Sequence, residues 1–220
     1  MQQTATTDRP AIAPPDEHAR LRRLQKRRKL ALALASVLLF GLLAFVSSPD
    51  WFGGLWHEGV ELLGLVLIGV AIVGRVWCTL YIGGRKAAEV VDTGPYSISR
   101  NPLYLFSFVG SFGIGAATGS LVAAVLVTAM VVAVFTVVVK GEERSLAALF
   151  GPAYADYCRR VPRFGPAFSL WRDMETVTVQ PRLLWHTLRD GLVFFLVVPL
   201  FEFVDLLQAK GMLVPVLVLP

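Results

Sequence analysis

The sequence has few charged residues for its length. Asp, Glu, Lys and Arg make up 17% of its 220 residues, whereas a soluble domain has about 25%. Hydrophobic residues make up 55% of the chain, and they gather in long blocks. The shortage of charge argues against a soluble globular protein, and the blocks predict one integral-membrane domain.

Cysteine and histidine are also scarce. Cys78 and Cys158 lie far apart and form no CxxC pair, which excludes a disulfide framework and a cysteine zinc site. The three histidines form no motif, so we expect no metal. A dinucleotide fingerprint is missing as well, because Gly113-Ile114-Gly115 follows no strand pattern; small residues there predict close helix packing.

Basic residues exceed acidic ones, with 21 Lys and Arg against 16 Asp and Glu. A basic balance often indicates nucleic acid as the partner. Here the basic residues flank apolar blocks, and anionic lipid headgroups explain that position more simply. We therefore expect a membrane lipid or a lipid-soluble molecule as the partner, and no nucleic acid.

The N-terminal quarter predicts a tail and a first span. Residues 1–29 are polar and end in the run RLRRLQKRRK, which predicts a disordered basic cytoplasmic N-terminus. Residues 30–46 form either a retained span or a signal peptide that lacks a clear cleavage site. A loop with Trp51 and Trp56 at the interface is expected over 47–61, so that 30–61 forms the first span and outer loop.

The middle of the chain predicts a hairpin in the membrane. Residues 103–139 contain no charged side chain, and as one helix they would measure about 55 Å, against about 30 Å for a hydrocarbon core. We expect this tight hairpin to turn at Thr118-Gly119-Ser120. With the span 62–82 and the flanking blocks, the fold class is an all-α integral membrane protein with about five membrane helices, in which a short cytoplasmic helical segment caps a cofactor site.

Lys and Arg are distributed unevenly between the two ends of these spans. The expected outer loop 47–61 and the turn at 118–120 have none, whereas segments 83–102 and 140–190 have eleven. The positive-inside rule then places the N-terminus and both basic segments in the cytoplasm, with the protein in the cell's inner or plasma membrane. We expect 62–166 to form the core and 167–220 a cytoplasmic linker and membrane-associated tail. Whether the tail crosses, re-enters or lies along the interface stays open.

The first polar segment contains DTGPYSISRNPLYL, residues 92–105. Gly94-Pro95 is a turn signal, and Asn101-Pro102 predicts a capped helix start that enters the membrane. Free N–H groups there, beside Arg100, favour an anion such as a carboxylate or phosphate. Alternatively, Arg100 is an ordinary membrane anchor, and Tyr96 and Tyr104 are interface aromatics.

The second polar segment brings two adjacent acids to the same surface. Gly141 is expected to end the membrane helix, and Glu142-Glu143 to open a short helix that Gly151-Pro152 stops. Tyr154 and Tyr157 then share one face at i, i+3. Either this segment is a solvated amphipathic helix on the headgroups, or its two acids hold an amino group or ribose hydroxyls.

Arg75 lies inside a predicted span, seven residues from its end, or about 10 Å at 1.5 Å per residue. A charge at that depth usually faces a partner or a wet cavity. Glu142, Glu143 or an anionic ligand are the partners we consider. Alternatively, the side chain snorkels to the interface and has no further role.

In this order and spacing, the segments resemble the superfamily of isoprenylcysteine carboxyl methyltransferases and phospholipid methyltransferases. The resemblance covers about residues 62–166, and Asn101 departs from it because histidine is commoner there. The matching residues are Gly94, Pro95, Tyr96, Arg100, Asn101, Pro102, Tyr104, Glu142, Glu143, Leu146, Gly151, Tyr154, Tyr157, Pro162 and Arg163.

The resemblance implies a membrane methyltransferase that uses S-adenosylmethionine and methylates a lipid-like or small hydrophobic acceptor. It implies catalytic roles for Arg75 and Glu143, and substrate contacts from Arg75, Tyr154 and Arg163. The cofactor contacts that it implies are Gly94, Tyr96, Arg100, Asn101, Pro102, Tyr104, Glu142, Glu143 and Tyr157.

Two other functions fit a chain of this kind. Membrane reductases that use NADPH have a similar R-x-P-x-Y element, but the Glu142-Glu143 pair directly after the hairpin argues against them. A non-catalytic membrane scaffold could be built from the same spans. The identity of the acceptor and the oligomeric state do not follow from the sequence.

Overall fold

The computed structural model describes residues 46–47, 54–85, 88–212 and 217–218. These residues are mostly helical. Two short strands, β1 (Val46–Ser47) and β2 (Leu217–Val218), form one parallel pair. The predicted disordered N-terminus and nearly all of the predicted span 30–46 lie outside the described residues, as does Trp51.

Helix α2 (Gly54–Ile82) begins earlier than we expected. The prediction of a loop over 47–61 is wrong for residues 54–61, which form the first two turns of this helix. His57 lies 3.1 Å from Glu61 one turn later, and Val60 is buried against Ala116 and Ala124. His57 and Glu61 thus pair on one face of the helix, while Val60 on another face packs against Ala116 and Ala124.

The predicted hairpin is present. Helix α4 (Pro102–Ala116) and helix α5 (Leu121–Phe150) are joined by a turn in which Gly119 has a φ of 74°. This is a conformation that glycine adopts without steric cost. The Ser120 hydroxyl then accepts a hydrogen bond from the Ala123 N–H at 3.2 Å and caps α5.

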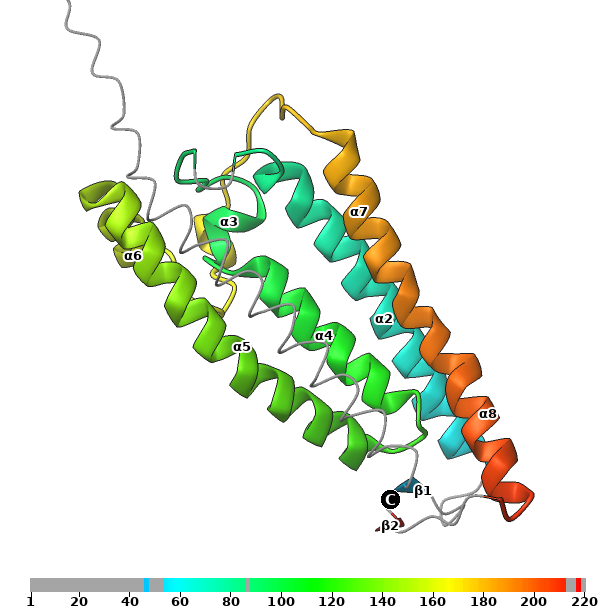
Figure 1. Cartoon of the computed structure of the whole chain (residues 1–220). Coiled ribbons are helices and arrows are strands. Elements are labelled where there is room, and N and C mark those ends of the chain that lie inside the picture. Colours follow the sequence, from blue (N-terminus) through cyan, green and yellow to red (C-terminus); the bar gives the residue numbers. More distant parts are fainter. Residues whose placement is uncertain (1–45, 48–53, 86–87, 213–216, 219–220) are drawn as a thin grey trace, which may run out of the picture.

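Helix α4 lies between α2 and α5 (Figure 1). Small residues permit this close approach, as predicted. A Cβ on Gly64 would lie 2.7 Å from the Gly113 carbonyl oxygen and from the Ala117 nitrogen. Deeper in the core, Ile68 packs with Ile114 and with apolar residues of α5. The three helices therefore form a rigid frame for the segments at their ends.

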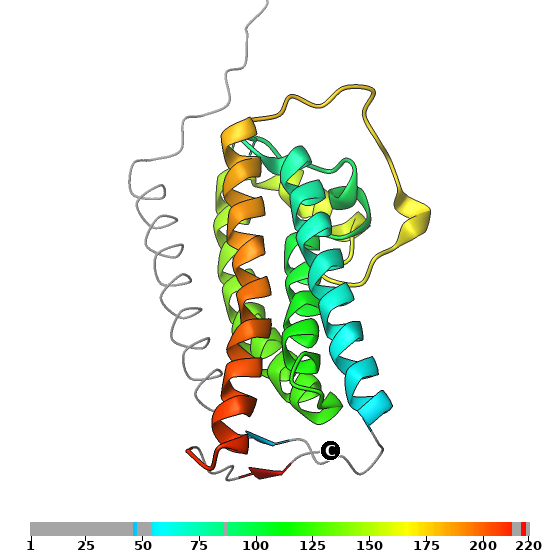
Figure 2. The ribbon, with the colours of Figure 1, turned by 90° about the vertical axis from the view of Figure 1, so that its right-hand side faces the viewer.

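The C-terminal region returns along α2. Helix α7 (Pro181–Leu192) packs on α2, and the 3-10 turn η2 (Val193–Leu196) and helix α8 (Val197–Ala209) continue from it toward the other end of the bundle, where α8 diverges from α2 (Figures 1 and 2). The Thr79 and Thr187 hydroxyls are 3.1 Å apart, and Gly191 lies against Ile72. This tail is part of the helical bundle.

Two of the described helices are long and apolar enough to cross a membrane, over Trp56–Ile82 and Leu121–Phe150. Helix α4 is apolar but has 15 residues, or about 22 Å, which is short for a span. The total of five membrane helices therefore stays a prediction. The segments with chemically interesting side chains, α3 (Pro95–Ile98), the start of α4, the end of α5 and α6 (Pro152–Arg160), meet at one end of the bundle (Figure 1).

Candidate functional site

A cavity of about 170 Å³ opens at this end of the bundle, between α2, α4, α5 and α6. Polar side chains from both predicted segments line it together with apolar ones. The lining residues are Arg75, Ile82, Glu89, Val90, Val91, Tyr96, Arg100, Asn101, Leu103, Tyr104, Ser107, Phe135, Glu142, Leu146, Phe150, Tyr154 and Tyr157.

Asn101 and Pro102 start helix α4 as predicted, but Asn101 does not cap it. Pro102 occupies the first turn, and the Asn101 side chain makes no capping hydrogen bond. Its amide donates instead to Oε1 of Glu143 and to the carbonyl of Arg163, both at 3.2 Å. The capping prediction is wrong: the side chain is oriented by the two bonds that its amide nitrogen donates, and its oxygen accepts no N–H of the first turn.

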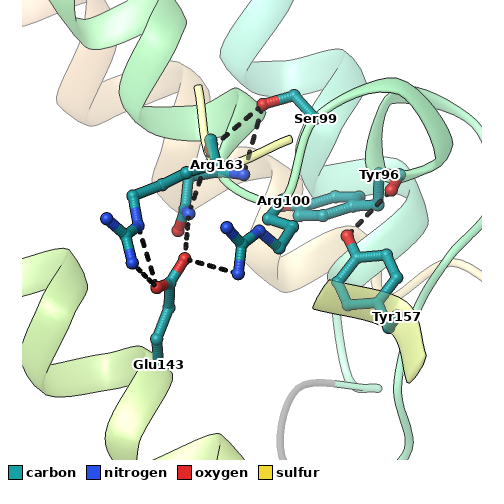
Figure 3. Close-up of polar contacts among 7 residues, drawn as sticks. Tyr96, Ser99, Arg100, Glu143, Tyr157 and Arg163 are labelled. Atoms are coloured by element: carbon teal, nitrogen blue, oxygen red, sulfur yellow. Dashed lines mark hydrogen bonds and ion pairs between the residues drawn. The ribbon is translucent and has the colours of Figure 1, made fainter. Parts of the chain in front are cut away.

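Glu143 joins the two halves of the site. Its side chain accepts hydrogen bonds from Arg163, with Nε at 2.9 Å and Nη2 at 2.8 Å, and it lies 3.5 Å from Arg100 Nη1. Figure 3 shows the two guanidinium groups reaching the carboxylate from opposite sides. Glu143 is 8% exposed, so these partners compensate the burial of its charge. The hydrogen bond from Arg163 raises the pKa of that guanidinium further.

The two adjacent acids have different surroundings. Our prediction that Gly141 ends the membrane helix is wrong, since α5 continues through Glu142 and Glu143 to Phe150. One interior glycine costs only about 1 kcal/mol, and a 30-residue helix tolerates it. Successive residues on a helix are about 100° apart. Glu142 therefore faces the cavity while Glu143 faces a neighbouring groove.

A strap, residues 161–172, holds the stretch 94–101 in place. The Arg100 N–H donates to the Pro162 carbonyl at 2.9 Å, and the Ala167 N–H to the Ile98 carbonyl at 2.9 Å. The Gly94 N–H donates to the Arg172 carbonyl at 2.7 Å. The backbone in front of α4 is thus fixed by a segment that lies more than 60 residues later in the sequence.

Asp92 adds a side-chain tether to the strap. Its carboxylate accepts hydrogen bonds from Arg160 at 3.0 Å and from Arg172 at 2.8 Å. Burial raises the pKa of Asp92, but the two arginines outweigh that effect and hold the pKa below its usual value. The Asp92 carboxylate is therefore charged near neutral pH.

Three tyrosines form the wall opposite α4. The Tyr157 hydroxyl donates to the Tyr96 carbonyl at 2.8 Å (Figure 3), and the Tyr154 and Tyr157 rings lie 5.9 Å apart. These two share one buried face of α6, as predicted. Burial raises the pKa of all three phenols above its ordinary value. They therefore stay neutral and can donate hydrogen bonds.

Buried donors of the cavity wall include the Tyr96 hydroxyl and Nε of Arg100. Within the described part of the chain, neither the Tyr96 hydroxyl nor Nε of Arg100 has a hydrogen-bond partner. Tyr96 is only 4% exposed. Leaving a buried polar group unsatisfied costs about 1–3 kcal/mol. Such groups commonly mark the place where a ligand completes a site.

Arg75 lies at the deeper end of the cavity. Its Nη1 donates to the hydroxyl of Ser107 on α4, and this hydroxyl donates to the Leu103 carbonyl at 2.9 Å. The rings of Tyr104 and Phe135, 4.9 Å apart, belong to the same cavity wall. At this end of the cavity, the Arg75 guanidinium and the Ser107 hydroxyl thus lie among largely apolar side chains.

The structure brings most of the predicted site residues together and separates a few. Gly94, Pro102, Glu143 and Arg163 do not line the cavity. Gly94 has a φ of 57°, and a Cβ there would lie 2.3 Å from the Tyr81 ring, so its place in the site is structural. Arg75, Tyr96, Arg100, Asn101, Tyr104, Glu142, Tyr154 and Tyr157 do line it.

Sequence reasoning missed Ser107 and the Asp92 tether. Ser107 follows Leu103 and Tyr104 by four and three residues, so the helical period could have placed it on the same face. Asp92 pairs with residues 68 and 80 positions away, and no local pattern signals such a contact. Among the described residues no group of three potential metal ligands gathers; that the protein uses no metal stays a prediction.

Comparison with known proteins connects the cavity to a family. The cobalt-zinc-cadmium resistance protein CzcN of Cupriavidus metallidurans is 35% identical over 178 residues, which are 80% of this chain and 82% of the relative. The nickel-cobalt-cadmium resistance protein NccN of Alcaligenes xylosoxydans xylosoxydans is 36% identical over 189 residues, 84% and 85% of the two chains. No solved structure shows significant similarity to the chain.

The family model described as phospholipid methyltransferase matches residues 60–153. This range contains the start of α4 with Arg100 and Asn101, and the end of α5 with both acids. Most of the cavity lining therefore lies in the part of the chain that the family model covers, with Tyr154 and Tyr157 just beyond it, and the chain belongs to the phospholipid methyltransferase family.

Proposed function

We propose that the protein is a membrane methyltransferase that transfers a methyl group from S-adenosylmethionine to a lipid-like or small hydrophobic acceptor. The observation that carries this proposal is that two buried donors, the Tyr96 hydroxyl and Arg100 Nε, find no acceptor among the described residues. Both belong to the cavity wall in the segment that the family model covers.

The chemistry of the cavity fits the methyl donor. S-adenosylmethionine supplies an electrophilic methyl group on a sulfonium, and it also carries a carboxylate, an amino group and ribose hydroxyls. Arg100 and Tyr96 would donate to its carboxylate, and Glu142 would accept from its amino group or ribose. The faces of Tyr104 and Tyr157 would attract the cationic sulfonium.

Apolar residues of the cavity would hold the remaining part of the donor. Val90 and Val91 lie before α3, and Leu146 and Phe150 lie on α5 beyond Glu142. Such side chains would cover a planar base and keep water from the reacting atoms. Because methyl transfer to a carboxylate or thiolate requires no strong base, alignment and exclusion of water are the main tasks of the protein.

Glu143 would act through its neighbours. Its carboxylate is engaged by Arg100, Asn101 and Arg163, so direct contact with a ligand would require breaking these bonds. We therefore assign Glu143 the role of positioning Arg100 and Asn101 at the cavity wall. This changes the role expected from the resemblance, in which Glu143 was itself catalytic.

Arg75 and Ser107 would orient the acceptor. They lie together at the deeper end of the cavity, between helices α2 and α4 whose outer faces are apolar. An anionic or polar group of an acceptor that enters from the bilayer would meet this corner. Tyr154 on the cavity wall and Arg163 beside it are the further substrate residues that we propose.

The relatives suggest the cellular setting. Both are named as resistance proteins for divalent metals, so we propose that the methylated product contributes to metal tolerance. The cavity would open to the cytoplasm, where the basic residues at this end of the bundle favour its placement. Deletion of the gene should then lower growth in cobalt, nickel or cadmium, and a chain carrying Arg100→Ala should not restore it.

A binding comparison tests the enzyme proposal. The purified full-length protein should bind S-adenosylmethionine and not NADPH in calorimetry. Arg100→Ala should weaken this binding by roughly 1.5–3 kcal/mol, and Arg159→Ala, an exposed residue outside the cavity, should not. Binding of NADPH alone would support a reductase, and binding of neither would support a scaffold.

The acceptor can be found with labelled donor. Membranes that contain the protein are incubated with methyl-labelled S-adenosylmethionine and separated into lipid, protein and volatile fractions. We expect label in the lipid or the volatile fraction, and its loss with Arg75→Gln while donor binding is retained. Absence of label from every fraction would contradict the proposed activity.

A further inference from the structure

A second hollow lies on the other side of Glu143 from the cavity. It is an open groove of about 460 Å³ between α5 and α6, and its lining combines cationic with small or apolar side chains. The lining residues are Lys140, Glu143, Arg144, Ala147, Tyr154, Ala155, Cys158 and Arg163.

The groove has an excess of positive charge. Lys140, Arg144 and Arg163 line it with one carboxylate, that of Glu143. Glu143 is already engaged by Arg163 and by Arg100 from the cavity side. Arg163 still has 39% of its side chain exposed. The groove therefore presents a net positive field to the outside.

The sequence of α5 indicates the level of the groove relative to the membrane. Lys140 is the first charged residue after the uncharged stretch 103–139, and Arg144 follows one turn later on the same face. In a helix that crosses the bilayer, the change from an uncharged run to Lys and Arg occurs at the level of the lipid phosphates. The cations of the groove thus lie at headgroup height.

An apolar stripe continues from the groove down the outside of α5. Val137 is 71% exposed and lies one turn before Lys140. Leu126, 54% exposed, and Ala133 are exposed on the same face further down. Such an outward apolar surface on a candidate span faces acyl chains. The groove and stripe together match an amphiphile with an anionic head above a hydrocarbon tail.

We propose that this groove binds the phosphate of an anionic membrane lipid as a site distinct from the methyl-transfer cavity. Lys140 and Arg144 contact the phosphate, and the acyl chains follow the α5 stripe. Tyr154 lines both the groove and the cavity, so the bound lipid covers the outer side of the wall that Glu143 and Tyr154 form. The lipid does not react.

Lipid titration of the full-length protein in detergent tests this site, and it needs no methyl donor. Native mass spectrometry would measure the apparent affinity for phosphatidylglycerol and for phosphatidylcholine. We expect the wild type to prefer phosphatidylglycerol. Lys140→Gln with Arg144→Gln should reduce that affinity about 30-fold, since each cation at the membrane surface contributes about a factor of five.

Two controls separate a specific site from general charge and from misfolding. Arg159→Gln removes a cation whose side chain is 77% exposed and paired with Asp156 outside the groove, so phosphatidylglycerol affinity should be unchanged. The swap Lys140→Arg with Arg144→Lys keeps both charges and should retain the affinity. A wild type without preference, or a double glutamine variant that binds as the wild type does, would overturn the proposal.

Inorganic phosphate distinguishes a headgroup from a free anion. Millimolar phosphate should leave the bound phosphatidylglycerol in place, because the acyl chains contribute to its affinity. Displacement of the lipid by phosphate would contradict a lipid site. Since binding of S-adenosylmethionine is measured separately, failure of either proposal can be recognised without the other.

Discussion

The side-chain amide of Asn101, at the start of α4, donates a hydrogen bond of 3.2 Å to the carboxylate of Glu143, far along α5. The same amide also donates to the carbonyl of Arg163 in the strap. One residue thereby connects the three segments that form the site. Asn101 is also the residue for which the resemblance led us to expect a histidine more often.

Replacement of Asn101 should affect stability according to the charge introduced. Asn101→Ala loses a buried hydrogen bond to a charged acceptor, so we expect a loss of about 1.5–3 kcal/mol in the free energy of unfolding. Asn101→Asp should lose more, because it places a second carboxylate against Glu143. Thermal unfolding in detergent measures both, and equal stabilities of the two variants would contradict the arrangement.

The two adjacent acids should separate into a stability role and a binding role. Glu143→Gln removes the charge between Arg100 and Arg163. We expect it to lower the free energy of unfolding by about 2–3 kcal/mol. This is no more than the smallest loss usual for a broken buried ion pair, because Arg163 is partly exposed. Glu142→Gln should cost less stability than Glu143→Gln and should weaken donor binding by about 1.5–3 kcal/mol. Calorimetric binding and thermal unfolding of both variants check this. If Glu142→Gln lowered stability more and Glu143→Gln weakened donor binding more, the two roles would have to be exchanged.

Removal of the Tyr96 hydroxyl should stabilise the protein without ligand and weaken its binding of the donor. Tyr96→Phe relieves a buried donor that has no partner among the described residues, which should raise stability by about 1 kcal/mol. The affinity for S-adenosylmethionine should fall by about 1 kcal/mol. Tyr157→Phe is the matched control, since it breaks the bond to the Tyr96 carbonyl and should lower stability instead.

Acid should weaken the tether between Asp92 and its two arginines. The pKa of Asp92 is lowered in the folded state, so its contribution is complete above the unfolded value of about 3.9 and is lost as pH falls through the folded value. Both arginines are about half exposed, and we expect a contribution of about 1 kcal/mol or less. Unfolding of wild type and Asp92→Asn between pH 3 and 6 should converge at the acid end. A constant difference across this range would exclude the carboxylate as its source.

Local chemistry predicted the points where the chain changes direction. Gly119 and Ser120 turn the hairpin, Pro102 starts α4, and Gly151 with Pro152 separates α5 from α6 as expected. These features depend on the backbone conformations that one or two residues allow. Such preferences follow from the residue type and can therefore be predicted from the sequence. The meeting of Arg100 with Glu143 was also predicted in outline, because the hairpin returns the chain to the surface at which it began.

The errors arose where local preference was given too much weight. Gly141 is a helix breaker by propensity, yet α5 continues through it. Asn101 is a good cap, yet its amide is engaged by Glu143. The packing of α7 along α2 and the bond from Arg75 to Ser107 were not foreseen. Each depends on residues that lie far apart in the sequence.

The backbone hydrogen bonds between the strap and residues 94–100 bear on how the protein is made. A ribosome synthesises Arg100 and Glu143 well before Arg163 and Arg172, so α4 and α5 can insert into a membrane before the strap exists. Until then Glu143 lacks Arg163, and Gly94 and Arg100 lack the carbonyls that their N–H groups meet in the finished fold. Completion of the cavity is therefore a late event of biogenesis, and a chain released after α6 would hold residues 60–153, which the family model matches, without the strap that supports them.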